Sequence, residues 1–281
     1  MEKERPEIVS VATSAKPRPE IVIACANAGV KVILAEKPLA PSLAEADAMV
    51  AACRANGVVL AVGCTRRWDA YWNAAKEQID RGELGRILQV NAFGQSALSH
   101  NGSHLMDLVR YLAGGEVAWV VGEMESDEQA AGDDDLMGNG YLAFANGVRA
   151  FVRSLPSGAA NWQFEAIGES GRVRSLANGS ELEWWQTLPD GSPARRLFPR
   201  PQRIESMGVR LVRDLITCHE TGKEPNCRGE DGVAVLELAI ALRESHRRGN
   251  HRVDLPLANR SLLIRSAETL HGDVPAGLRR R

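Results

Sequence analysis

Three residues of this sequence, Lys37, His100 and His104, carry side chains that could bind a small molecule or move a proton. Lys37 directly follows an apolar run, VKVILA, and the proline after it favours an extended backbone at the lysine. From the end of a buried strand, its ammonium group can point into a ligand crevice. The alternative is a surface lysine whose aliphatic stem packs on the protein while its head group stays in water.

The two histidines belong to a polar stripe. His100, His104, Asp107 and Tyr111 recur every three or four residues, beside an apolar stripe on a helix expected at 103–113. Two imidazoles and a carboxylate on one line can serve acid–base catalysis, hold a metal ion, or form a hydrogen-bonded layer at the edge of the core. No fourth metal ligand can be named, so no metal is assigned. The other two interpretations stay open.

The first third of the chain alternates strands and helices. Its apolar runs are short and continuous, as in strands buried on both faces, and they lie at 8–12, 30–35 and 58–63. Pro19 marks the start of one intervening helix, and Ser42 with Glu45 forms the capping-box signature of another. This order predicts a parallel sheet with right-handed crossovers, whose ligands bind beyond the carboxyl ends of the strands.

The pattern changes after Trp68. Helices are expected at 69–81, 103–113, 204–220 and 231–248, and strand-like runs at 87–93, 117–124, 141–145, 148–154, 162–167, 173–176, 182–188 and 253–256. Asn146-Gly147 between two of these runs predicts a tight hairpin. We therefore expect a partial Rossmann-type parallel sheet in residues 1–66, then a domain at 67–270 with a large, mostly antiparallel open sheet and flanking helices. A solvated tail is expected at 271–281. Asp133-Asp134-Asp135 is interpreted as a solvated acidic loop, with a role in covering the substrate as the alternative.

The composition excludes several classes of protein. The 281 residues carry 34 Lys+Arg against 36 Asp+Glu, and 44% of them are hydrophobic. This near-balance gives no reason to expect nucleic acid or an anionic membrane as a partner, and no apolar run is long enough to span a bilayer. Five scattered cysteines without a CxxC pair indicate neither a disulfide framework nor a zinc ribbon, so we expect a cytoplasmic protein.

Several short motifs occur in the order seen in a known family. They are Ile8 to Thr13, Ala28-Gly29, Glu36-Lys37-Pro38-Leu39-Ala40, Val62 to Trp68, Gly82 to Gly85, Gly102 to Asp107 and Gly229 to Gly232. Over about residues 8–257 the chain resembles the glucose-fructose oxidoreductase / inositol dehydrogenase / rhizopine catabolism (Gfo/Idh/MocA) family. Each motif alone is weak, whereas EKP followed by RRW and GxHxxD is quite specific.

The resemblance implies an NAD(P)-dependent oxidoreductase that acts on a sugar, inositol or related polyol and forms a homo-oligomer, a dimer or tetramer, through its open sheet. By the same resemblance, Lys37 binds the reacting oxygen and His104 assists proton transfer, with His100 as a further catalytic residue. The residues expected to bind the cofactor are Thr13, Glu36, Lys37, Pro38 and Arg66. Those expected to bind the substrate are Lys37, Arg67, His100, Asn101 and His104.

Two features depart from the family pattern. His100 stands where family members commonly carry aspartate, and no GxGxxG occurs in the sequence. We expect that the half of the Rossmann sheet that cradles the pyrophosphate is lacking, which would leave the strand at 8–12 as a sheet edge. The alternative function is therefore a truncated or non-catalytic family member that acts as an oligomerising or ligand-sensing protein.

Overall fold

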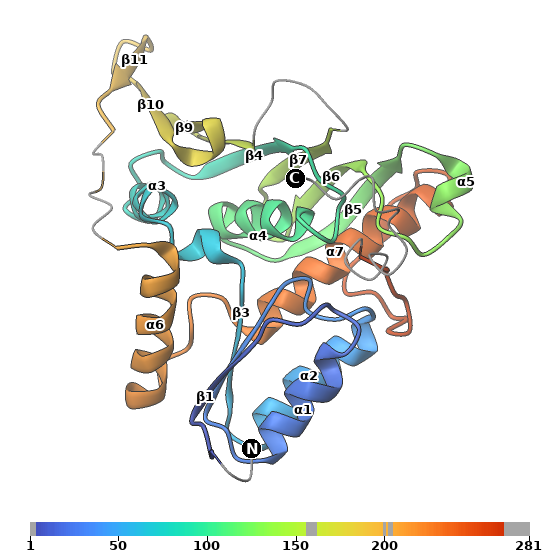
Figure 1. Ribbon diagram of the computed structural model, residues 1–281. Coiled ribbons are helices and arrows are strands. Elements are labelled where there is room, and N and C mark those ends of the chain that lie inside the picture. Colours follow the sequence, from blue (N-terminus) through green and yellow to red (C-terminus); the bar gives the residue numbers. More distant parts are fainter. Residues whose placement is uncertain (1–3, 156–161, 199–200, 202–204, 267–281) are drawn as a thin grey trace, which may run out of the picture.

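A small parallel sheet forms the N-terminal part of the computed structural model, which describes residues 4–155, 162–198, 201 and 205–266. Its strands lie in the order β1-β2-β3, with bounds Ile8–Val11, Val32–Ala35 and Val59–Val62. Helices α1 (Arg18–Asn27) and α2 (Leu43–Ala55) cover one face (Figure 1). The predicted capping box is confirmed, since Ser42 Oγ accepts from Glu45 N and the Glu45 carboxylate accepts from Ser42 N. Within the described residues β1 is an edge strand, as expected, and Ile8 is 36% exposed.

A nine-stranded sheet dominates the rest of the chain. Its order is β11-β10-β9-β8-β4-β7-β6-β5-β12, and every pairing except β4 with β7 is antiparallel. In chain order the strands are β4 (Ile87–Gly94), β5 (Val117–Met124), β6 (Gly138–Phe144), β7 (Arg149–Ser154), β8 (Gln163–Gly168), β9 (Gly171–Leu176), β10 (Glu181–Thr187), β11 (Pro193–Arg196) and β12 (Val253–Asp254). The expected open, mostly antiparallel sheet is thus confirmed, and Asn146-Gly147 joins β6 to β7.

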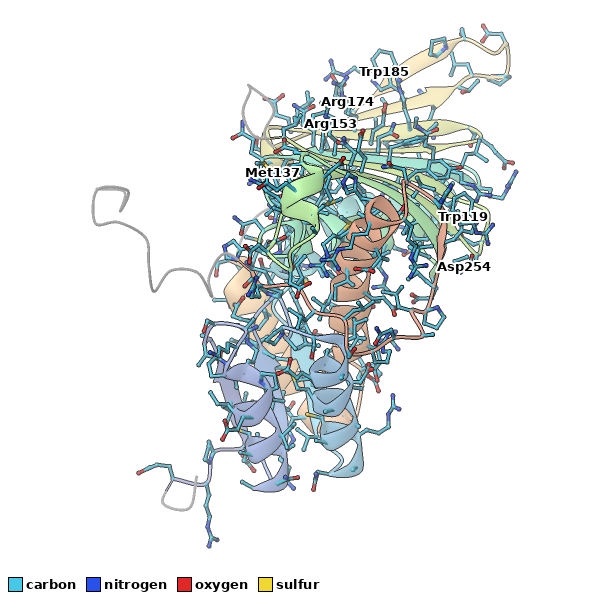
Figure 2. The ribbon with its side chains drawn as sticks, turned by 90° about the vertical axis from the view of Figure 1, so that its right-hand side faces the viewer. Trp119, Met137, Arg153, Arg174, Trp185 and Asp254 are labelled. Carbon is cyan, nitrogen blue, oxygen red and sulfur yellow. The ribbon has the colours of Figure 1, made fainter. Side chains whose placement is uncertain are left out.

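Within the described part of the chain, helices cover only one face of this large sheet. Helix α4 (Gly102–Ala113) packs on β4, and α7 (Gly229–Arg247) packs on β5. A Cβ at Gly122 would lie 2.2 Å from Leu242 O, so this glycine allows α7 to approach the sheet closely. The opposite face is open, and Figure 2 shows Arg153, Arg174 and Trp185 projecting from it.

Helix α7 also connects the two sheets, because it packs against α2 and β3 as well as β5. Helices α3 (Ala70–Asp80) and α6 (Met207–Thr221) flank the 3-10 turn η1 (Thr65–Trp68). This turn contains the boundary predicted between residues 66 and 67. The described residues include no helix that is both apolar enough and long enough to cross a bilayer.

Some short elements had no signal in the sequence. They are η1, the four-residue helix α5 (Asp127–Ala130), the 3-10 turn η2 (Ala177–Gly179) and β11. Each of these elements has only three or four residues, so a hydrophobic period is too short to recognise or both faces of the element are polar. The start of the helix predicted at 204–220 and the tail predicted at 271–281 lie outside the described residues.

Candidate functional site

Lys37 reaches from the small sheet to the loop that precedes α4. It follows β2, and its Nζ donates to His100 O at 3.2 Å and to Asn101 Oδ1 at 3.4 Å. Three of the predicted site residues therefore meet, although Lys37 lies 63 positions before His100 in the sequence. His100 contributes its backbone carbonyl to this contact.

The glycine of the GxHxxD motif lets this loop turn tightly into the helix. A Cβ at Gly102 would lie 2.4 Å from Ala97 O, closer than real Cβ contacts. Because α4 begins at Gly102, His100 precedes the helix and does not extend its polar stripe. Side chains at the two later motif positions, His104 and Asp107, point into different surroundings.

The polar stripe thus divides instead of forming one cluster. His104 is half-buried beside Trp162, with 6.4 Å between the ring centroids. Asp107 is 1% exposed and binds Arg67, whereas the Tyr111 hydroxyl donates to Asn73 Oδ1 at 3.1 Å. Asp107 is thus engaged by Arg67, whereas His104 packs beside Trp162 and lies near enough to Lys37 for that charge to act on the imidazole.

His104 is held in its neutral form. Burial has the largest effect on its pKa, and the positive charges of Arg66, Lys37 and His100 act in the same direction, lowering it to about 3. Within the described part of the chain its Nδ1 is buried without a hydrogen-bond partner. A neutral imidazole can accept a proton or a hydrogen bond from a ligand hydroxyl.

Arg66 lies against the same tryptophan. Its guanidinium carbon is 4.4 Å from the centroid of a Trp162 ring, and its Nη2 donates to Asn178 Oδ1 at 2.9 Å. Trp162 directly precedes β8, and Asn178 lies in η2 between β9 and β10, so both lie in segments that connect strands of the large sheet. The sequence analysis missed these two residues because nothing in the pattern links them to the strand ends of the small sheet.

Arg67 takes a structural position. It is 7% exposed, its Nε donates to both Asp107 oxygens at 3.0 Å, and its Nη1 lies 3.3 Å from Asp231 Oδ2. This geometry contradicts the expectation that Arg67 contacts the substrate, because its donors already bind protein carboxylates. Although burial alone would lower the pKa of Arg67, these carboxylates raise it above its usual value.

The ion pair extends into a network across three elements. Asp231, in the first turn of α7, also accepts from Arg110 Nη1 of α4 at 3.1 Å. Burial opposes ionisation of Asp231, but Arg67, the Arg228 backbone N–H and Arg110 together hold its pKa below its ordinary value. The network therefore joins η1, α4 and α7 and favours the charged form of Asp231, whereas burial raises the pKa of Asp107 despite its contact with Arg67.

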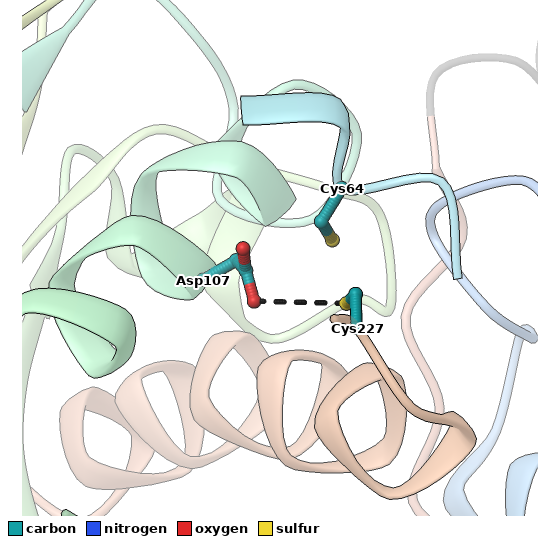
Figure 3. A group of neighbouring side chains, drawn as sticks. All are labelled: Cys64, Asp107 and Cys227. Carbon is teal, nitrogen blue, oxygen red and sulfur yellow. Dashed lines mark hydrogen bonds between the residues drawn. The ribbon is translucent and has the colours of Figure 1, made fainter. Parts of the chain in front are cut away.

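Two cysteines lie beside this network (Figure 3). Cys64 follows β3, Cys227 precedes α7, and their sulfur atoms and an Asp107 oxygen lie within 4.8 Å of one another. Arg67 already binds both oxygens of Asp107. The contact with Cys227, together with burial, raises the pKa of the Cys64 thiol. These three side chains pack β3 against the start of α7.

The strand ends of the small sheet carry the residues predicted for the cofactor. Arg18, which is fully buried, donates to the carbonyls of Thr13 and Pro38 and so ties the ends of β1 and β2 together. Among the described residues, Thr13 Oγ1 is buried without a hydrogen-bond partner. Glu36 Oε2 accepts from Lys37 N at 3.2 Å. An unpaired hydroxyl and a carboxylate at this edge fit the hydroxyl-rich part of a dinucleotide.

Within the acidic segment 133–135, Asp135 is not solvated, which corrects its interpretation from the sequence. Asp135 Oδ1 accepts from Ser99 N at 2.8 Å, and Oδ2 accepts from His100 N at 2.6 Å. Asp134 instead pairs with Arg265 on the surface, at 2.9 Å. Asp135 therefore fixes the loop that Lys37 contacts.

Comparisons with known proteins agree with this architecture. Residues 1–64 match a family model described as an oxidoreductase family with an NAD-binding Rossmann fold, and residues 89–255 match its C-terminal alpha/beta domain. The D-apiose dehydrogenase of Paraburkholderia graminis is 30% identical over 277 residues, covering 88% of this chain and 72% of its own length. The myo-inositol 2-dehydrogenase of Thermotoga maritima is 27% identical, with 85% and 77% covered.

Solved structures share the fold. An aldose-aldose oxidoreductase from Caulobacter crescentus, complexed with glycerol, has a TM-score of 0.72 and 26% identity, and the match covers 89% of this chain and 79% of that one. An inositol dehydrogenase homologue from Azotobacter vinelandii, complexed with NADH and myo-inositol, has a TM-score of 0.74 at 18% identity, with 88% and 78% covered.

Ionisation of Asp135 should reduce stability, and the effect should depend on pH. Burial raises its pKa from an ordinary 3.8 to about 6, although the N–H groups of Ser99 and His100 and the charge of Arg243 favour the carboxylate. Its contribution to the free energy of unfolding is thus fully present below the unfolded pKa and is lost as pH rises through about 6. We expect the stability of the wild type relative to Asp135→Asn to fall by roughly 2–3 kcal/mol between about pH 4 and pH 7 in urea titrations.

The matched control for this experiment is Asp134→Asn, because Asp134 is half-exposed and its side chain pairs on the surface. Its stability difference from the wild type should change little over the same pH range. The buried position of Asp135 would be contradicted if the stability difference from the wild type depended equally on pH in both variants. It would also be contradicted if that difference did not depend on pH for Asp135→Asn.

Proposed function

Since the chain belongs to the Gfo/Idh/MocA family of oxidoreductases, we propose that it transfers hydride between NAD(P) and a hydroxyl or carbonyl carbon of a sugar, inositol or related polyol. The family models confirm the resemblance found in the sequence. The observation that carries the proposal is the contact of Lys37 Nζ with the loop 100–101, beside the neutral His104. The contact supports the proposal because an ammonium donor and a proton acceptor would then lie near the strand ends, where parallel sheets bind their ligands.

The two residues have complementary roles in oxidation. When bound, the nicotinamide ring accepts the hydride that leaves the substrate carbon. Lys37 donates a hydrogen bond to the reacting oxygen, and the neutral imidazole of His104 accepts the hydroxyl proton as the carbonyl forms. His100 and Asn101 hold further hydroxyl groups of the polyol, since they lie in the loop that Lys37 contacts.

The cofactor side consists of Thr13, Glu36, Lys37 and Pro38. The unpaired Thr13 hydroxyl and the Glu36 carboxylate support this assignment, because both offer hydrogen bonds at the ends of β1 and β2. Arg66, which the resemblance places on the cofactor side, contacts Trp162 and Asn178 of the large sheet. We assign it to the substrate side.

The open face of the large sheet supports a homo-oligomer. Phe151 is 47% exposed there, and its ring contacts Tyr141, which in turn contacts Trp119, with centroid distances of 5.1 and 5.4 Å. The three rings come from β7, β6 and β5, on the side opposite α4 and α7. A second copy of the chain would bury this aromatic row. The five buried, unbridged cysteines support a reducing, cytoplasmic location.

Substituting the two reacting residues should abolish turnover while preserving cofactor binding. We expect Lys37→Met and His104→Gln to lower kcat by about 10²–10⁴-fold, because each removes a proton donor or acceptor from the reacting oxygen. NADH formation is measured with a panel of inositols and aldoses, and NADH affinity by fluorescence titration. The control is His219→Gln, a change on the exposed surface of α6. Unchanged kcat in both variants would refute these roles for Lys37 and His104, whereas a wild type that neither turns over nor binds NADH would favour the non-catalytic alternative.

Introducing a charge into the aromatic row should separate the subunits. Phe151→Glu would place a carboxylate against its symmetry mate, so we expect a monomer in light scattering where the wild type is a dimer or tetramer. The control is Val212→Glu, which charges a similarly exposed apolar residue on α6. A monomeric wild type, or dissociation caused only by Val212→Glu, would exclude this interface.

A further inference from the structure

The space around His104 is electropositive. The charges that most affect its pKa belong to Arg66, Lys37 and His100, and all of them act as positive neighbours. Two carboxylates near this space, those of Glu36 and Asp135, bind backbone N–H groups. Glu36 accepts from Lys37 N, and Asp135 accepts from the N–H groups of the loop before α4. A ligand in this space therefore meets positive charge and few competing anions.

Arg66 differs sharply from its neighbour Arg67. Arg67 binds the carboxylates of Asp107 and Asp231, whereas no carboxylate among the described residues lies within ion-pair distance of Arg66. The guanidinium of Arg66 stacks on Trp162, and its Nη2 donates a hydrogen bond to Asn178 Oδ1. Stacking fixes the plane of the guanidinium, and its other donors lie in that plane.

The hydrogen bond between Arg66 and Asn178 is exposed, so the remaining donors of the guanidinium can reach a ligand. Planar guanidinium groups match carboxylates and phosphates by paired, charge-assisted hydrogen bonds. Asn178 neutralises no charge, and the carboxylates of Asp69 and Asp107 act on Arg66 only from beyond ion-pair distance. The Arg66 side chain lies close enough to His104 to lower its pKa, which places the charge beside the reacting groups.

We propose that the substrate is an anionic sugar or polyol, whose carboxylate or phosphate binds Arg66 while its reacting hydroxyl lies between Lys37 and His104. This inference rests on the proposed hydride transfer, because it uses the same site. Binding of the anion also offsets the positive charge around His104, which makes the imidazole a better proton acceptor in the complex than in the free protein.

The test compares sugars that differ only at C6. Calorimetry with the NADH-saturated chain measures Kd for D-glucose, D-glucuronate and D-glucose 6-phosphate, and for the matching galactose series. We expect at least one acidic sugar to bind about ten-fold or more tightly than its neutral partner. The uronates and the 6-phosphates distinguish a carboxylate from a phosphate.

Arg66→Gln should remove this preference, because an amide keeps some hydrogen bonding but no charge. The control is Arg86→Gln, since Arg86 pairs with Glu169 on the exposed edge of the large sheet. It should retain the preference of the wild type. If neither the uronates nor the 6-phosphates bound better than their neutral sugars, the proposal would be overturned, as it would be by a preference that survives Arg66→Gln. A loss confined to NADH affinity would place Arg66 on the cofactor instead.

The outcomes also separate this proposal from the hydride transfer on which it rests. Turnover of neutral sugars that depends on Lys37 but not on Arg66 would disprove the anionic substrate and leave the oxidoreductase activity intact. Arg66-dependent binding of acidic sugars without NADH formation would support the anion site and count against the activity. Absence of binding by every acidic sugar in the panel would disprove the anion site.

Discussion

The buried ion pair between Arg67 and Asp107 is the interaction on which the rest of the site depends. It joins the turn after β3 to helix α4, and Asp231 extends it to the start of α7. Both partners are almost fully buried, so removal of one would leave an uncompensated charge in the core. The pair therefore fixes how the small sheet meets the helices of the large sheet.

The same pair positions the groups that perform the chemistry. His104 lies one helical turn before Asp107 on α4, so fixing Asp107 also fixes the imidazole. Arg66 precedes Arg67 in a 3-10 turn, where neighbouring side chains point in different directions. One arginine thus enters the core, while the other lies over Trp162 at the edge of the site. Lys37 reaches the site separately, from a strand end that Arg18 holds in place.

The sequence predicted the elements well where apolar residues follow a clear period. The three strands of the small sheet, helix α4 and its neighbours lie within a few residues of their expected bounds. The EKP and GxHxxD motifs pointed to Lys37 and to the loop before His104, which lie in contact in the structure, because each motif lies at the end of a regular element.

Other parts of the site could not be found in this way. Nothing in an RR pair shows which arginine is buried, since that depends on carboxylates 40 and 164 positions away. Trp162 and Asn178 lie at the site only because the chain folds so that the start of β8 and the turn η2 contact Arg66 of η1. Asp135 looked solvated within a run of three aspartates, and only the backbone N–H groups of the loop show that it is anchored.

A double-mutant cycle on Arg67 and Asp107 tests most directly whether this buried pair holds the site together. Urea unfolding of Arg67→Met, Asp107→Leu and the double variant gives the coupling energy. Each single change should cost about 3–5 kcal/mol, because it leaves a buried charge, and the double variant should recover much of that loss. Single losses that simply add, with no coupling between the two positions, would contradict the account.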